Sequence, residues 1–301
     1  MMVDYLLSSR FGPPLGLAFA RLLPRRLAYS LVDRSAARMA ARPNSALVRA
    51  LTVNQAVVRG LDERDPRLGE AVRQVLKHAG RGYADLFGGM ARGRRALEAL
   101  CSVDGPFWDH VLRTYAEGHG VIVVAGHLAG FDPFILWLGN KRLPIQGLSY
   151  PDPRGSYKAQ LAMRKRYGLN LTPVSMEALR QAIRHLRSGG IVMTAVDRPG
   201  LGGEPLRFFG RRAVLPVGHA RLSLRTGAPM FVCACHSDGR GHYHSTGVKL
   251  DPPAPSGDEK ADAVHLAQRA LDVLEGYIRL WPEQWLMFQP VWPQGSLASE
   301  A

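Results

Sequence analysis

The chain has 301 residues, enough for one large α/β domain or two small ones. Its residues are 46% hydrophobic and 21% charged, which is typical of a globular protein and excludes both wholesale disorder and a multi-span membrane protein. The 39 Lys and Arg residues outnumber the 25 Asp and Glu residues, giving a net charge of +14. This excess indicates a polyanionic partner, namely nucleic acid, an anionic membrane surface or an acidic carrier protein.

The cysteines and the N-terminus indicate a reducing compartment. There are three cysteines, and Cys233 and Cys235 are poorly spaced for a disulfide within one strand. Asp4 and Arg10 interrupt the apolar N-terminus, so no secretory signal is expected. Apolar runs of about 18 residues are also lacking, so the sequence predicts a soluble or peripheral protein.

Residues 1–115 are expected to be a mainly helical, Arg-rich portion. An apolar segment at 15–23 precedes Arg34, Arg38 and Arg42, which recur every four residues and therefore line one stripe of a helix. A solvated helix face explains most such stripes. The adjacent apolar segment makes an interfacial membrane element an equal alternative, and we expect this portion to associate with a membrane.

Residues 116–295 are expected to form an α/β catalytic core, continuous with the helical portion. Unbroken apolar runs predict buried strands at 121–124, 191–196 and 230–235. Amphipathic patterns predict helices at 176–187, at 217–226 and around 264–278. Alternation of strands and helices predicts a mostly parallel central sheet with helices on both faces.

The sharpest motif is Gly-His-Leu-Ala-Gly-Phe-Asp-Pro at 126–133, directly after the first buried strand. Asp132 before Pro133 is expected to cap a helix, which places His127 at the carboxyl end of the strand, where open α/β sheets build their sites. The Asp132 carboxylate would hold one imidazole tautomer and leave the other nitrogen free as a base. A capping Asp beside an incidental His is the alternative. We predict that His127 and Asp132 are catalytic.

Other charged residues are candidates for substrate binding. Asp197 and Arg198 close the strand at 191–196 and should lie on the same sheet edge as the catalytic pair, while Glu204 follows a glycine-rich loop. Arg164 and Arg166 belong to a basic cluster that suits phosphate, although a solvated surface cluster is the default interpretation.

Two groups near the C-terminus are predicted to be structural. Cys233 and Cys235 with the nearby histidines lack the spacing of a paired-ligand zinc site and fit a hairpin, so no metal is predicted. Trp281, Trp285 and Trp292 are expected to be packing anchors.

The motifs that would supply a protein nucleophile or bind a nucleotide are missing. The sequence contains neither a Gly-x-Ser-x-Gly elbow nor the glycine fingerprints of phosphate and dinucleotide loops. A direct transfer, in which the substrate's own hydroxyl attacks an activated donor while His127 removes its proton, is therefore favoured.

The ordered set of motifs resembles a known family. The His-x4-Asp turn is followed by Asp197-Arg198, by Leu-Arg-Phe-Phe-Gly at 206–210 and by the Trp-rich segment 281–292. Together they are similar to the lipid A late acyltransferases and the phosphatidylinositol mannoside acyltransferases of the lysophospholipid acyltransferase superfamily, over about residues 45–293. The Asp197-Arg198 pair and the ending at 287–292 look closer to the mannoside branch.

The resemblance implies a fold like that of glycerol-phosphate acyltransferases, in a peripheral enzyme on the cytoplasmic face of the inner membrane. Its reaction would move a fatty acyl chain from acyl carrier protein or coenzyme A to a hydroxyl of a membrane glycolipid or lysophospholipid, without a cofactor. His127 matches the family's base and Asp132 its acidic partner; Arg164 and Arg166 match a basic pair that meets phosphates, and Asp197 an acidic position near the site. Anionic membrane lipids are expected partners.

Two other classes of function stay open from the residues alone. A hydrolase could use the same His/Asp pair on a thioester or phosphoester. A nucleic-acid-binding protein would explain the charge of +14, but the chain lacks a recognisable module of interleaved aromatic and basic residues, so no nucleic-acid partner is expected.

Overall fold

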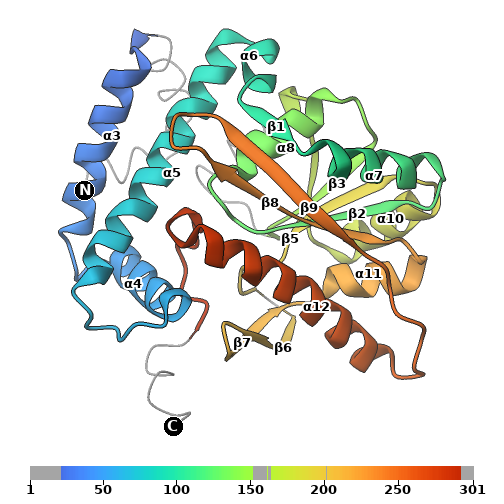
Figure 1. Ribbon diagram of the computed structural model, residues 1–301. Coiled ribbons are helices and arrows are strands. Elements are labelled where there is room, and N and C mark those ends of the chain that lie inside the picture. The colour runs from blue at the N-terminus through green and yellow to red at the C-terminus, as the bar shows by residue number, and fades with distance from the viewer. Residues whose placement is uncertain (1–21, 152–160, 162–163, 201, 293–301) are drawn as a thin grey trace.

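The fold is a mostly parallel α/β sheet with helices on both faces (Figure 1). The computed structural model describes residues 22–151, 161, 164–200 and 202–292. The large sheet has the strand order β1-β9-β8-β2-β5-β3-β4, and every neighbouring pair is parallel except β8 and β9. A separate antiparallel hairpin pairs β6 with β7. The predicted fold class is confirmed.

The strands of the large sheet are β1 (Cys101–Val103), β2 (Val121–Ala125), β3 (Ile145–Ser149), β4 (Asn170–Pro173), β5 (Ile191–Ala195), β8 (Met230–Ser237) and β9 (Tyr243–Leu250). The hairpin consists of β6 (Gly203–Phe208) and β7 (Arg211–Pro216). The helices are α3 (Arg25–Ala40), α4 (Ala46–Arg59), α5 (Arg67–Arg92), α6 (Arg94–Glu98), α7 (Gly105–Ala116), α8 (Phe131–Asn140), α10 (Met176–Arg187), α11 (Gly218–Thr226), α12 (Glu259–Leu280) and the short 3₁₀ helix η1 (Pro282–Gln284).

The strands and helices predicted for the core are present. All five residues of β2 are buried, as its unbroken apolar run predicts. Helix α10 has the predicted bounds because Ser175 caps its first turn and Gly189 follows it with a φ of 82°. Strands β8 and β9 form the predicted hairpin around the Cys-x-Cys segment.

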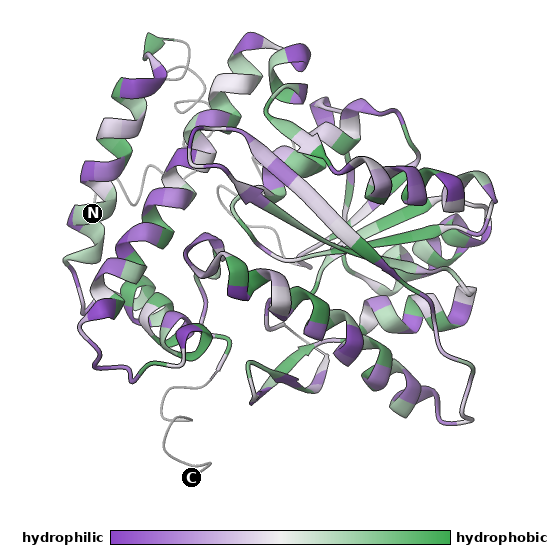
Figure 2. Cartoon of the chain, viewed as in Figure 1, coloured by the Kyte–Doolittle hydropathy of each residue, from purple (hydrophilic) through white to green (hydrophobic). Residues whose placement is uncertain are grey.

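Two hydrophobic cores lie on the two faces of the sheet, and β2 contributes to both. Ile122 and Val124 pack with residues of α10, α11 and α12. Val121 and Val123 pack with residues of α5, α7 and α8 on the other face. Figure 2 shows hydrophobic residues concentrated along β2 and its neighbours. The centre of the sheet is therefore a rigid support for residues at its carboxyl edge.

The N-terminal portion is mainly helical, but it also contributes one strand to the large sheet. A third cluster joins α3, α4 and α5, and α3 lies along α5 (Figure 1). Strand β1 falls within the segment expected to be helical and pairs in parallel with β9. The boundary between residues 115 and 116 stays a prediction.

The predicted arginine stripe is partly present. Arg34 and Arg38 are exposed on α3, but Arg42 lies beyond the last residue of that helix, Ala40. Of the apolar segment at 15–23, only Leu22 and Leu23 fall within the described residues. Among the helices that the structure describes, none is long and apolar enough to cross a membrane.

One local prediction is wrong, because Asp132 is not a helix cap. Helix α8 begins at Phe131 with Gly130 as its N-cap, and no side chain caps it. The Gly130 N–H donates to the Cys235 carbonyl at 3.0 Å, and a Cβ at Gly130 would lie 2.8 Å from the Cys235 Cβ. The close approach to β8 therefore sets the start of the helix at the glycine and places Asp132 inside the first turn.

Candidate active site

The sheet register brings His127 and Asp197 together. Strands β2 and β5 are parallel neighbours with Ala125 opposite Ala195, so the residues that follow them emerge at one carboxyl edge. Gly126 permits the tight packing needed here, because a Cβ at this position would lie 2.6 Å from Leu274 Cδ1. His127 is therefore at the strand end, as predicted, but its nearest carboxylate comes from the adjacent strand.

The Asp197 carboxylate is fully buried and holds His127 in one orientation. Asp197 Oδ1 lies 2.7 Å from His127 Nδ1. The backbone N–H of His127 donates to Asp197 Oδ2 at 2.8 Å, and the indole N–H of Trp285 donates to the same oxygen at 2.8 Å. Since an ionised carboxylate only accepts hydrogen bonds, Nδ1 carries the proton and Nε2 is the unprotonated nitrogen.

The electrostatics of the pair suit a base. Burial lowers the pKa of His127, but the charge and hydrogen bond of Asp197 outweigh burial, so this pKa is raised above its ordinary value. Burial raises the pKa of Asp197, but the charge of the His127 ring and the hydrogen bonds from His127 and Trp285 outweigh burial, so this pKa is lowered. The His127 side chain is 29% exposed, and within the described part of the chain Nε2 has no hydrogen-bond partner. This nitrogen can accept a proton from a substrate.

The C-terminal segment also positions His127. The Leu286 N–H donates to the His127 carbonyl at 2.7 Å, and Trp285 forms a β-bridge with Leu128. Trp285 and Trp292 are both buried, which confirms their predicted packing. The hydrogen bond from Trp285 to the carboxylate was not anticipated, although a buried indole N–H usually needs an acceptor.

Asp132 does not contact the imidazole in the expected way. Its carboxylate forms an ion pair with Arg164, whose side chain is only 10% exposed. Because Asp132 lies inside the first turn of α8, its side chain points to Arg164, and Asp197 takes the position that holds the tautomer. The negative charge of Asp132 still contributes to raising the pKa of His127, after the larger effects of burial and Asp197.

Of the other predicted binding residues, Arg198 lies beside the site, whereas Arg166 and Glu204 lie elsewhere. Arg198 lies 4.4 Å over the Tyr150 ring and donates to Gln289 Oε1 at 3.1 Å. Arg166 is exposed on the surface. Glu204 instead forms ion pairs with two basic residues at 3.1 and 3.3 Å, Arg221 and Lys260.

The position of Glu204 follows from the direction of its hairpin. Strand β6 runs along α12: Glu204 contacts Lys260 near the beginning of the helix, and Phe209 donates its N–H to Glu275 near the end. Phe209 packs against Trp285, so the site lies at the end of the hairpin opposite to Glu204. Substrate binding by Glu204 is not supported by this placement.

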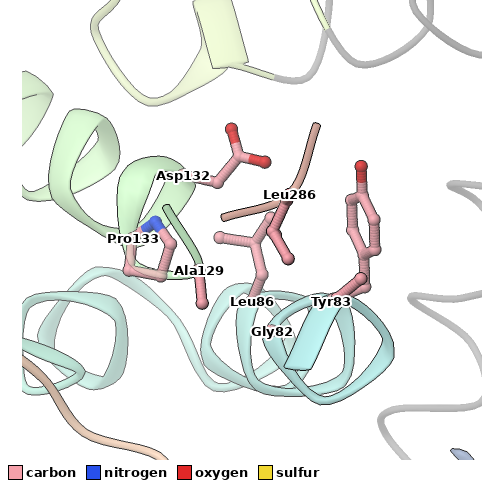
Figure 3. A pocket seen from close by; sticks show the side chains of 8 residues that line it. Gly82, Tyr83, Leu86, Ala129, Asp132, Pro133 and Leu286 are labelled. Carbon is pink, nitrogen blue, oxygen red and sulfur yellow. The ribbon is translucent and has the colours of Figure 1, made fainter. Parts of the chain in front are cut away.

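A small pocket opens between α5 and the turn that carries the catalytic candidates (Figure 3). Asp132 and Tyr83 lie on either side of Leu286 there. The lining residues are mostly apolar: Ala79, Gly82, Tyr83, Leu86, Ala129, Asp132, Pro133 and Leu286. Helix α5 belongs to the portion assigned from sequence to membrane association, so its part in the site was missed.

The three cysteines are buried in the core. In the part of the chain that the structure describes, no three His, Cys, Asp or Glu side chains are grouped to hold a metal ion. Cys101 and Cys233 are buried, and burial raises the pKa of each thiol to about 12. The thiols are therefore uncharged core residues at neutral pH.

The chain is similar to known proteins over most of its length. The profile of the family described as bacterial lipid A biosynthesis acyltransferase matches residues 13–294. A phosphatidylinositol mannoside acyltransferase from Mycobacterium tuberculosis (strain H37Rv) is 27% identical over 192 residues, which are 61% of this chain and 58% of that protein. A protein of the same name from Mycolicibacterium smegmatis is 26% identical over 191 residues, 61% of this chain and 60% of that protein. The matched region thus spans less than two thirds of these relatives.

Proposed function

Since the chain belongs to the family of bacterial lipid A biosynthesis acyltransferases, we propose that it transfers a fatty acyl chain from a thioester to a hydroxyl group of a membrane glycolipid. The observation that carries this proposal is the buried Asp197 carboxylate on His127 Nδ1, which leaves Nε2 open as a general base. The names of the two mycobacterial relatives favour a phosphatidylinositol mannoside as the acceptor.

The reaction needs two proton transfers through one imidazole. His127 Nε2 accepts the proton of the acceptor hydroxyl while the hydroxyl oxygen attacks the thioester carbonyl carbon. The tetrahedral intermediate breaks its C–S bond, and the imidazolium returns the proton to the departing thiolate. Asp197 stabilises the imidazolium that exists between the two steps. The products are one ester and one thiol, and no cofactor enters the balance.

The residues around the base suit the two substrates. Arg164, which Asp132 holds near the site, and Arg198 supply positive charge for phosphate groups of the donor or the acceptor. We place the first carbons of the acyl chain against the apolar side chains of the small pocket beside Asp132. We assign Asp132 to positioning Arg164 rather than to holding the imidazole.

One face of α3 supports attachment to an anionic membrane, which we place at the cytoplasmic side of the inner membrane. Leu27, Leu31, Arg34 and Arg38 are spaced so that they share one helical stripe, and all four are exposed. Leucines beside arginines are the composition of an interfacial element. Each arginine near an anionic surface contributes about 1 kcal/mol to binding.

Product analysis tests the reaction. Purified protein is given an acyl thioester with and without a glycolipid acceptor, and mass spectrometry follows the ester product and the free fatty acid. We expect the acceptor to gain one acyl chain and little free acid to form. Release of free acid at the same rate with or without the acceptor would identify a hydrolase and contradict the proposal.

Vesicle flotation tests the membrane stripe. We expect binding to anionic vesicles that weakens with salt and falls roughly tenfold or more in Arg34→Gln/Arg38→Gln. Arg180→Gln/Arg187→Gln removes the same charge from the exposed side of α10 and is the matched control. Equal losses in both double variants would show that net charge, not α3, governs binding.

A further inference from the structure

Six exposed basic residues surround the short helix α6. They lie at the end of α5, on α6, just after α8 and in the segment 164–168: Arg92, Arg94, Arg95, Arg142, Lys165 and Arg166. We call them the α6 basic surface. We propose that this surface docks an acidic acyl carrier protein, which presents its acyl thioester to His127; the proposal rests on the acyl transfer proposed above.

Polar contacts between the four segments show that these charges belong to one surface. The Arg94 guanidinium donates to the Arg166 carbonyl at 3.4 Å, and the Asn140 side-chain amide donates to the Arg94 carbonyl at 3.5 Å. The Tyr167 hydroxyl donates to the Met90 carbonyl at 3.4 Å. The ends of α5, α6 and α8 and the segment 164–168 therefore lie side by side.

The charge of this surface is of one sign. In the stretches 90–98, 139–142 and 164–168, the single acidic residue is Glu98. Its carboxylate is already paired with Lys141, so it does not offset the six exposed cations. A one-sign surface of this kind raises the association rate of an oppositely charged protein and makes its binding depend on salt.

The composition of the surface favours a protein partner over a membrane. The stripe on α3 combines its arginines with Leu27 and Leu31, which are 54% and 50% exposed. In the three stretches that form the α6 basic surface, the structure shows no exposed large hydrophobic side chain. Interfacial membrane elements need such side chains, whereas an acidic protein surface needs the charges alone.

The surface is continuous with the site. Lys165 directly follows Arg164, whose buried guanidinium contacts Asp132 in the first turn of α8. A carrier seated on the α6 basic surface would therefore bring its thioester to the edge where His127 lies. Because the charges are spread over four segments, they match the extended face of a protein better than the few phosphates of free coenzyme A.

A comparison of three donors tests this docking. The same acyl chain is supplied on an acidic acyl carrier protein, on coenzyme A and on pantetheine, which has neither a protein part nor a nucleotide. In Arg94→Glu/Arg95→Glu we expect the KM for the carrier-bound donor to rise about tenfold or more and its salt dependence to shrink. The kcat/KM for acyl-pantetheine should be retained, because this donor does not touch the surface.

The matched control reverses the same charges elsewhere. Arg180→Glu/Arg187→Glu, on the exposed side of α10, should leave the KM for the carrier-bound donor unchanged. If Arg94→Glu/Arg95→Glu does not fold, Arg94→Gln/Arg95→Gln should raise the same KM by a smaller factor. An unchanged KM for the carrier-bound donor in the folded α6 variant would overturn the proposal. An equal rise of this KM in the α6 variant and in the α10 control variant would also overturn it.

Further outcomes identify other partners. A rise confined to acyl-coenzyme A would assign the charges to nucleotide phosphates, and loss of vesicle flotation with an unchanged carrier KM would assign them to a membrane; both overturn the docking. If the protein transfers from no donor, the acyl-transfer proposal fails on its own. Docking is then decided by titrating the carrier protein against the unchanged protein and against Arg94→Glu/Arg95→Glu. Weaker binding to the variant supports the docking proposal, and equal affinity overturns it.

Discussion

Two carboxylates, Asp197 and Asp85, are almost equally buried but accept hydrogen bonds from different kinds of partner. The Asp197 side chain is 0% exposed and the Asp85 side chain 2%. Asp197 accepts hydrogen bonds from the ring and the backbone of His127 and from the indole of Trp285. Asp85 accepts hydrogen bonds from three side chains of other elements: Arg25, Tyr29 and Tyr243.

The partners decide what each carboxylate does. Burial and Asp85 raise the pKa of Tyr29 and of Tyr243, so these donors stay protonated at any physiological pH. Asp85 therefore fastens α3 and β9 to α5. Asp197 is paired with an imidazole, which can take up a proton, and it raises the pKa of that ring. The His127 side chain is 29% exposed, and its second nitrogen has no hydrogen-bond partner among the described residues. We therefore propose a catalytic role for Asp197, whose partner can change charge, and a structural role for Asp85.

The largest effect is expected when the imidazole that pairs with Asp197 is removed. His127→Ala removes the proposed general base, so we expect acyl transfer to fall about 10²–10⁴-fold. Asp197 keeps two of its three donors, and the thermal midpoint should change little. Steady-state rates and circular dichroism check both points. Near-normal transfer by the folded variant would remove the proposed mechanism.

The second change removes the Asp85 carboxylate and with it the acceptor of the hydrogen bonds from Arg25, Tyr29 and Tyr243. Asp85→Ala leaves Tyr243 and Arg25 without their shared acceptor, so we expect a loss of about 2–4 kcal/mol in the free energy of unfolding. Denaturant titration measures this loss, and hydrogen exchange should show the amides of α3 exchanging faster. An unchanged unfolding free energy would show that the network does not fasten α3.

A smaller effect is expected when a single hydrogen bond to the Asp197 carboxylate is removed. Trp285→Phe keeps a buried ring but removes one donor to the Asp197 carboxylate, so we expect roughly a tenfold fall in kcat/KM. Trp292→Phe is the matched control, because the Trp292 indole N–H is buried and has no hydrogen-bond partner in the described structure. Equal falls in the two variants would assign the effect to packing rather than to the hydrogen bond.

The sequence was sufficient for features that depend on local pattern. The unbroken apolar run predicted β2, which places His127 at a strand end, and the amphipathic pattern at 176–187 predicted α10. Strands with weaker patterns were missed. Strand β3 contains Gln146 and Gly147, and β1 has three residues, so neither carries the β-branched run that marked β2.

Features that depend on register could not be read from the sequence. Asp132 is five residues from His127 and Asp197 is 70, so sequence proximity favoured the wrong carboxylate as the imidazole's partner. The right one depends on the parallel register of β2 with β5. The turn at Phe209 and Gly210, with φ of 52° and 75°, closes a β6–β7 hairpin that the motif alone did not reveal.

The pH dependence of kcat/KM tests most directly whether Asp197 holds His127 as the proposed catalytic base. A protonated His127 cannot accept the hydroxyl proton, so activity should fall as the pH drops through its pKa, which Asp197 raises above the ordinary 6.5 despite the opposing effect of burial. Asp197→Asn removes that charge and leaves burial, so the acid limb of its residual activity should move to lower pH, further than in Asp132→Asn. An acid limb that stays in place in Asp197→Asn, or moves further in Asp132→Asn, would contradict the account.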